Sequence, residues 1–184
     1  SGIVGYGSKI FYLNEDDMNI CSLDPQSGGI EVIFAKLSEI NSFFIYNGTM
    51  YISGKGDNGS EIYSLDLNSG SSTSILISQE TLKLLSAGNN RLYYLSTGSE
   101  HIVCSVDCSG NSVKEIVTLE GNTFDHPVDK KNIYIDAYYY RRDYGHKYYV
   151  VYTDNGSYEE LSESEYNKKH TNDKRADGID DGSY

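Results

Sequence analysis

The acidic side chains on or beside the predicted strands are the residues whose type could support catalysis. A glycoside hydrolase needs two carboxylates that face each other across a pocket at a fixed separation. The acids that could form such a pair are Asp57, Asp107, Asp125 and Asp136. The sequence does not show which of them face each other. A glycan-active enzyme is therefore an alternative that a pocket containing one pair, with one acid buried, would favour.

Other catalytic and cofactor motifs lack their required context. The segment 54–59 matches GxGxxG, but a strand-like run follows where a dinucleotide site needs a helix, so we expect a hairpin there. There is no nucleophile elbow, phosphate-binding loop or HExxH zinc motif, and the four histidines lack ligand spacing. We therefore expect a non-catalytic protein that carries no cofactor and no metal site.

The segment 138–149 concentrates tyrosine and arginine in an otherwise acidic chain. These residue types dominate binding hot spots and also stack on sugars or cations. We predict a ligand-binding or partner-binding site formed by Tyr138, Tyr139, Tyr140, Arg141, Arg142 and Tyr144. The alternative is that the tyrosines extend a buried strand and the arginines neutralise nearby acids.

The elements that would position this segment belong to a repeat. Aromatic-rich strands centred on equivalent apolar residues recur at intervals of 40, 42 and 41 residues. The equivalent residues are Ile10, Met50, Leu92 and Ile133. A second strand in each of the first three copies ends on an aspartate before a Ser-Gly turn, which suits a hairpin. Four short strands per period of about forty residues are typical of a propeller blade.

The recurring Ile-Tyr-Tyr-like strand, polar hairpin, Ile-Tyr-Ser-Leu-Asp strand and Ser-Gly turn resemble a known family over roughly residues 3–161. It is the bacterial domain of unknown function related to the YWTD propeller of lipoprotein receptors, although no copy here contains Tyr-Trp-Thr-Asp. The resemblance implies a β-propeller and an extracytoplasmic binding or scaffolding role, with no catalytic residues to transfer.

We therefore predict an all-β, propeller-like array of four four-stranded antiparallel blades, either a closed ring or part of a larger propeller. The predicted modules are residues 6–45, 46–87, 88–128 and 129–161. The last module lacks a fourth strand, which residues 1–5 could supply to close the ring. Residues 162–184 are predicted to be a polar tail, either a linker or a coil on the surface, with a stretch docked through its apolar residues Tyr166 and Ile179 as the alternative.

The charge balance limits the partners. The 184-residue chain carries 27 acidic residues against 15 lysines and arginines, a formal charge of −12, which disfavours nucleic acid. No apolar run approaches the roughly twenty residues of a membrane-spanning helix. We expect a protein or carbohydrate partner at the bacterial cell surface, an extracellular or envelope location, and self-association if blade edges remain open.

Overall fold

The computed structural model describes residues 2–121, 123–125, 132–138 and 145–176, without the side chains of 123–125 and 173–176. The described residues form sixteen strands and one helix, α1 (Glu163–Ala176). The first two sheets contain β1 (Ile3–Tyr6), β2 (Lys9–Asn14), β3 (Asn19–Leu23) and β4 (Ile30–Phe34), then β5 (Glu39–Tyr46), β6 (Thr49–Gly56), β7 (Gly59–Asp66) and β8 (Ser72–Ser78). The third and fourth contain β9 (Thr81–Gly88), β10 (Arg91–Thr97), β11 (His101–Asp107) and β12 (Lys114–Thr118), then β13 (Thr123–Asp125), β14 (Asn132–Tyr138), β15 (His146–Tyr152) and β16 (Tyr158–Leu161).

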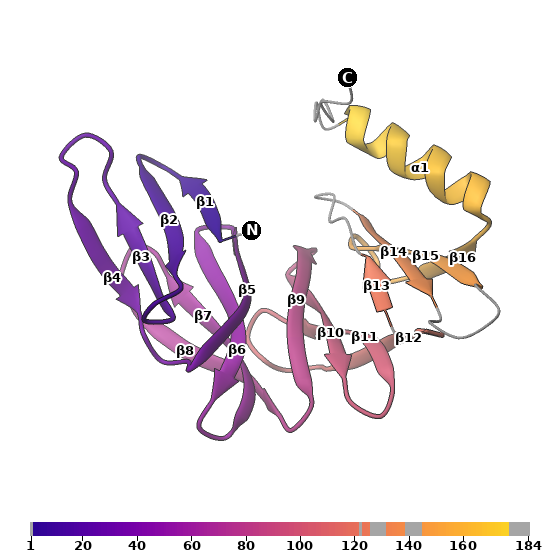
Figure 1. Ribbon diagram of the computed structural model, residues 1–184, viewed down its shortest axis with the longest axis horizontal. Coiled ribbons are helices and arrows are strands. Elements are labelled where there is room, and N and C mark those ends of the chain that lie inside the picture. Colours follow the sequence, from indigo (N-terminus) through magenta and orange to yellow (C-terminus); the bar gives the residue numbers. More distant parts are fainter. Residues whose placement is uncertain (1, 122, 126–131, 139–144, 177–184) are drawn as a thin grey trace. The chain divides into compact units, whose positions relative to one another are not determined.

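Each sheet is an antiparallel meander whose spatial order follows the chain (Figure 1). The chain divides into two compact units, Ser1–Leu84 and Leu85–Tyr184. Among the described residues, no helix has the length and apolar character needed to cross a membrane.

The sheets begin one strand earlier than the predicted modules. Phe43–Ile45, expected to end module one, lies in β5 and pairs with β6 in the second sheet. The physical reason is the two-residue turn Asn47–Gly48, in which both residues have positive φ; such a turn joins neighbouring strands of one sheet. For the same reason residues 3–5 belong to β1, which pairs with β2 in the first sheet. The fourth sheet takes its fourth strand from β13, so it is complete without residues 1–5.

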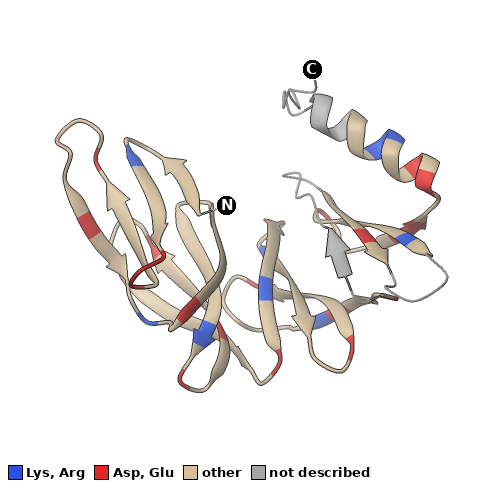
Figure 2. Cartoon of the chain, in the orientation of Figure 1, with Lys and Arg blue, Asp and Glu red and all other residues tan. Residues whose placement is uncertain are grey.

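The aspartate–glycine turns have the structure that the sequence predicts. Asp66 Oδ1 accepts hydrogen bonds from the backbone N–H groups of Asn68 (2.9 Å) and Ser69 (2.8 Å), and Gly70 has φ of 70°. These hydrogen bonds to the charged form lower the pKa of the Asp66 carboxyl. Equivalent turns follow β3 at Asp24 and β11 at Asp107. Acidic residues therefore lie at the hairpin turns of both units (Figure 2).

The GxGxxG segment is a hairpin, as predicted, because Gly56 pairs with Gly59 between β6 and β7. Gly54 has a separate role in packing. A β-carbon there would collide with the backbone carbonyl of Glu39, where a bulge between Ile40 and Ser42 brings β5 close to β6. The glycine is therefore needed for the close approach of these two strands.

The two units bury equivalent interfaces between consecutive sheets. In the first unit Phe11, Ile20 and Phe34 of the first sheet pack against Met50 and Ile52 of the second. In the second unit the core joins β10 and β11 side chains to β14 and β15 side chains. Those side chains are Tyr93, Leu95, Val103, Ile133, Ile135, Tyr149 and Val151.

Residues 163–176 form a helix, so the predicted coil for the tail is wrong over this stretch. The helix starts with a capping box: Glu165 N–H donates to Ser162 Oγ (3.3 Å), and Ser162 N–H donates to Glu165 Oε2 (3.0 Å). Tyr166 anchors the helix and is only 7% exposed. It packs with Tyr134, Val150 and Leu161 on the outer face of the fourth sheet.

Candidate functional site

A row of stacked aromatic rings marks the end of the fourth sheet next to residues 139–144. Tyr138 ends β14 and lies directly opposite His146, which begins β15. Their ring centroids are 5.5 Å apart with a 27° interplanar angle, and His146 stacks on Tyr148 at 5.8 Å and 14°. Alternate residues of a strand share one face, so the pleat itself brings His146 and Tyr148 together. We call Tyr138, His146 and Tyr148 the aromatic row.

A carboxylate fixes the middle ring of this row. His146 Nδ1 is 2.8 Å from Asp136 Oδ1, and Asp136 lies opposite Tyr148 in the strand register. The His146 side chain is 42% exposed and that of Asp136 is 23% exposed, so solvent reaches the pair. Burial raises the pKa of the Tyr148 phenol, and the charges of Asp136 and Glu163 add to the effect. The phenol therefore stays protonated and can donate a hydrogen bond.

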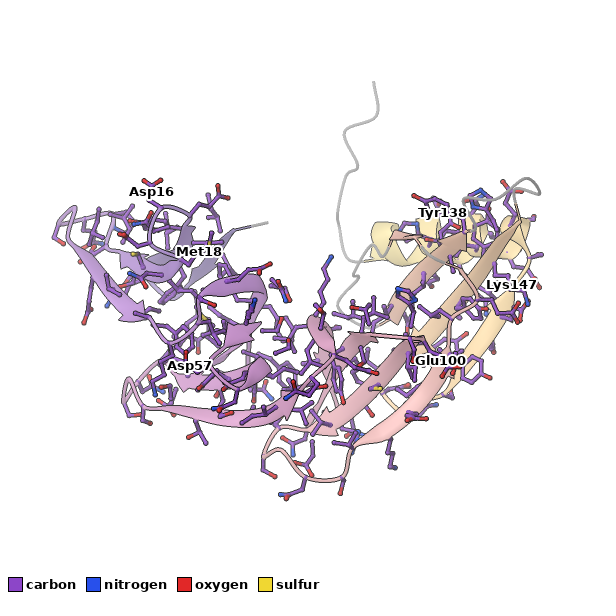
Figure 3. All side chains as sticks on the ribbon, turned by 60° about the horizontal axis from the view of Figure 1, so that its bottom comes forward. Asp16, Met18, Asp57, Glu100, Tyr138 and Lys147 are labelled. Carbon is purple, nitrogen blue, oxygen red and sulfur yellow. The ribbon has the colours of Figure 1, made fainter. Side chains whose placement is uncertain are left out.

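The opposite face of the same strand end carries a cation. Lys147 donates to Glu120 at 3.0 Å and lies 3.4 Å from Glu160. The hydrogen bond to Glu120 is the main cause of the raised pKa of Lys147. Figure 3 shows Tyr138 and Lys147 at this end of the sheet. Both faces of the strand end therefore hold ordered polar or aromatic groups.

Helix α1 covers the other part of the outer face. The Tyr148 and Tyr166 ring centroids are 4.9 Å apart, and Tyr166 meets Tyr134 edge-on at 5.8 Å. Lys169 Nζ donates to Glu159 Oε2 (2.6 Å) and to the Tyr152 hydroxyl (3.0 Å). The pKa of Glu159 is lowered chiefly by the hydrogen bond from Lys169. Helix α1 therefore contacts the aromatic row at Tyr148, and Tyr138 lies at the opposite end of the row.

Of the predicted site residues, only Tyr138 is described by the structure. It lies half-buried at the end of β14 and belongs to the aromatic row. The other predicted site residues lie outside the described residues: Tyr139, Tyr140, Arg141, Arg142 and Tyr144. Sequence reasoning did not assign His146, Asp136 or Tyr148 to the site. The period-two spacing of Asp136 with Tyr138, and of His146 with Tyr148, is the signal that identifies their shared face.

The acids nominated for catalysis have separate environments. Asp107 accepts hydrogen bonds from Ser109 and Asn111 within its own turn, chiefly from Ser109, and these lower its pKa. Asp57 lies at the hairpin between β6 and β7 (Figure 3). Asp125 and Asp136 are register partners on β13 and β14. This is the one nominated pair that the described strands bring together, and Asp136 is already bound to His146.

A groove in the first unit is a second candidate site. It has a volume of about 460 Å³ and lies between the first sheet and the turn that joins β7 to β8. Its apolar lining includes Phe11 and Leu65, and its rim includes the ion pair of Lys9 and Glu31 at 3.8 Å. The rim carboxylate of Asp66 is engaged in its own turn. The groove has room for a small polar group, but the lining side chains cited here are not arranged as a catalytic or metal-binding set.

The described residues contain no cluster of three or more His, Cys, Asp or Glu side chains that could hold a metal ion. In the acidic hairpin after β2, Asn14 Nδ2 donates a hydrogen bond to Asp17 Oδ2 at 3.2 Å. Cys21 and Cys104 are buried at equivalent positions of their sheets.

Comparison with known proteins decides the fold. TolB from Acinetobacter baumannii matches 84% of this chain over 41% of its own, with 20% identity and a TM-score of 0.58. A protein described as TolB from Agrobacterium tumefaciens matches 84% of this chain over 60% of its own, with 19% identity and a TM-score of 0.61. The β-propeller domain of the Trilobed protease from Pyrococcus furiosus, described with an open velcro topology, matches 89% over 56%, with 13% identity and a TM-score of 0.58.

The fold is that of a β-propeller. The predicted fold class is confirmed: four four-stranded antiparallel sheets with propeller neighbours. The chain spans 41% to 60% of the length of these propeller chains. No protein-family model matches the sequence, and no curated protein matches it. The comparisons therefore establish the fold alone.

Proposed function

We propose that this chain is a non-catalytic interaction module that binds a protein partner at the end of the fourth sheet where Tyr138 and His146 lie. The observation that carries this proposal is the aromatic row, with His146 held between Tyr138 and Tyr148 and bonded to Asp136. Rings fixed in this way lose little conformational entropy when a partner covers them. Tyrosine is also among the residue types enriched in binding hot spots.

The sequence that follows the row has a composition typical of binding sites. Tyr138 is followed directly by residues 139–144, which contribute further tyrosines and two arginines. Arginine and tyrosine together give a site that is apolar at its centre and can form directional hydrogen bonds. A protein surface with an apolar patch for the rings and hydrogen-bonding groups around it fits this chemistry best.

The wider setting is part of the same proposal. The TolB structures are similar in fold, and the sequence resembles the domain related to the YWTD propeller. Both likenesses support a binding role in a bacterial envelope or extracellular compartment. The net charge of −12 favours partners that carry basic surfaces, because opposite charge speeds encounter and excludes other anionic surfaces.

The binding proposal is tested by alanine substitution in the row. Tyr138→Ala removes the outermost described ring and should weaken partner binding by about 2 kcal/mol, roughly 30-fold in Kd, which is typical of a hot spot. Tyr158→Ala is the matched control, because Tyr158 is also a strand tyrosine and is 47% exposed on β16. Equal Kd values for the two variants would refute the assignment of the site.

A glycan-active enzyme is the less favoured candidate: Asp125 and Asp136 are register partners on β13 and β14, but the Asp136 carboxylate is bonded to His146. The test is release of sugar from bacterial glycans by the wild-type chain and by Asp125→Asn. Release that Asp125→Asn abolishes would replace the binding proposal with an enzyme.

A further inference from the structure

One face of the first sheet is apolar and exposed. The register places Ile3, Tyr12, Cys21 and Val32 in a single row across β1, β2, β3 and β4. The neighbouring row is Gly5, Ile10, Leu23 and Ile30. Directly paired residues point to the same side of a sheet, so these eight residues form one surface. We call it the first-sheet face.

The first-sheet face carries no charged residue, yet water reaches its large side chains. Ile3 is 68% exposed, Ile30 is 65% exposed and Val32 is 54% exposed. The other face of the same sheet is already used, because Phe11 and Phe34 pack against the second sheet. Contiguous exposed apolar surface of this kind marks an interaction site.

The repeat shows what covers this surface in the other blades. The corresponding rows of the second sheet contain Phe43, Ile52 and Tyr63, and Ile45, Met50 and Leu65. All six belong to the core that joins the second sheet to the first. The same strand positions in the fourth sheet, Ile133 and Ile135, are at most 1% exposed and pack against β10 and β11 side chains. In each unit, this face of a blade is thus buried by the blade that precedes it.

We propose that the first-sheet face receives a further propeller blade, a four-stranded antiparallel sheet that presents aromatic and aliphatic side chains like Phe11, Ile20 and Phe34. The proposal extends to the first sheet an interface that the structure shows twice. It concerns a different surface from the aromatic row of the fourth sheet and does not depend on the proposed function.

The composition of the edge strand β4 supports this occupant. At the fourth-strand positions where the first sheet has Ile30 and Val32, the second sheet has Ser72 and Ser74. An edge strand that merely faced water would suit such polar residues. The two β4 side chains extend the apolar surface across the full width of the sheet, which is the width of another blade.

A tandem duplication tests the proposal. Residues 1–40 are repeated ahead of the full chain, so that the added blade meets the first-sheet face through the connection that normally joins the first sheet to the second. The added blade should raise the Tm of the chain by at least about 5 °C. Val32→Lys in the original copy should abolish most of that gain, because the lysine is now covered. The matched control is Val32→Lys in the added copy, whose own face stays exposed, and this should leave the Tm unchanged.

If the duplicated protein does not fold, measurements on the original chain still test the proposal. Val32→Lys should change the Tm by less than about 2 °C, and light scattering should show a monomer before and after the substitution. Ile77→Lys, at a residue 50% exposed on β8, is the control for adding a charge.

A dimer that Val32→Lys dissociates would assign the face to a second copy. A large fall in Tm would show that the chain already covers the face itself. Either result overturns the proposal. It is also overturned if, in the duplicated chain, Val32→Lys leaves the Tm unchanged in both copies.

Discussion

Tyr166→Ala should detach α1 from the fourth sheet while leaving the sheets folded. Tyr166 is 7% exposed, and its ring lies 4.9 Å from Tyr148 and 5.8 Å from Tyr134 between centroids. Truncating a buried aromatic side chain costs about 3–5 kcal/mol. The loss here should be near 3 kcal/mol, about the low end of that range, because a terminal helix can move to relieve the cavity.

A loss of about 3 kcal/mol raises the equilibrium constant for helix detachment by roughly a hundredfold or more. Helix α1 has only 14 residues, and helices of this length are marginal in water without packing. Detachment should therefore appear as unfolding of the helix itself.

Hydrogen exchange measured by mass spectrometry provides the assay. Peptides from α1 should exchange about a hundredfold faster in Tyr166→Ala than in the wild type, whereas peptides from β10 and β11 should be unchanged. Tyr158→Ala, at a tyrosine 47% exposed, should leave the exchange of both regions as it was. Unchanged protection of α1 in Tyr166→Ala would show that the aromatic contacts do not hold the helix, and the account of the outer face would fail.

Three further predictions follow from local geometry. Gly54→Ala should destabilise the fold by about 2 kcal/mol or more in urea denaturation, because the new β-carbon meets the Glu39 carbonyl; an unchanged midpoint would refute the close approach. Ser162→Ala should cost about 1 kcal/mol of α1 docking, seen as faster exchange in the first helical turn, and no change would exclude the capping box with Glu165. In the folded protein the three hairpin aspartates have pKa values below the ordinary value of 3.8. Their charged forms therefore stabilise the fold above pH 3.8. This stabilisation is lost as the pH falls through the lowered pKa values of the folded state. Thermal melts should therefore show stability falling with acidification in this range, and substituting all three by asparagine should flatten that fall. The three are Asp24, Asp66 and Asp107.

The blade repeat could be predicted because two local signals agree in each copy. Apolar residues such as Met50 and Leu92 recur at a period that matches one blade, and the aspartate–glycine turns fix where strands reverse. Because a four-strand repeat looks the same from any starting strand, the period alone does not show where a blade begins. The tight Asn47–Gly48 turn determines that point by tying β5 to β6.

Helix α1 was missed because its pattern of apolar residues is weak. Most of its side chains are polar, and Tyr166 is the main apolar anchor, with His170 one turn later. The Ser162–Glu165 capping box was the available signal. Burial of the anchor depends on Tyr134 and Tyr148, which lie far earlier in the chain, so this contact could not be derived locally.

The candidate site could be predicted only in part. The concentration of tyrosine and arginine after β14 directed attention to Tyr138. The pairing of His146 with Asp136 depends on the register between β14 and β15, which brings together residues ten positions apart in the sequence. This register is set by the whole sheet and cannot be determined from the residue types alone.

The central claim, that the aromatic row forms a protein-binding surface, is tested most directly by comparing binding to three immobilised chains. Wild type, Tyr138→Ala and Tyr158→Ala are exposed to an envelope extract of the source organism, and the retained proteins are quantified by mass spectrometry. The account predicts at least one protein retained equally by wild type and Tyr158→Ala and reduced at least about tenfold by Tyr138→Ala, with Kd values of the purified pair showing the same order. A set of retained proteins that is identical for all three chains would contradict it.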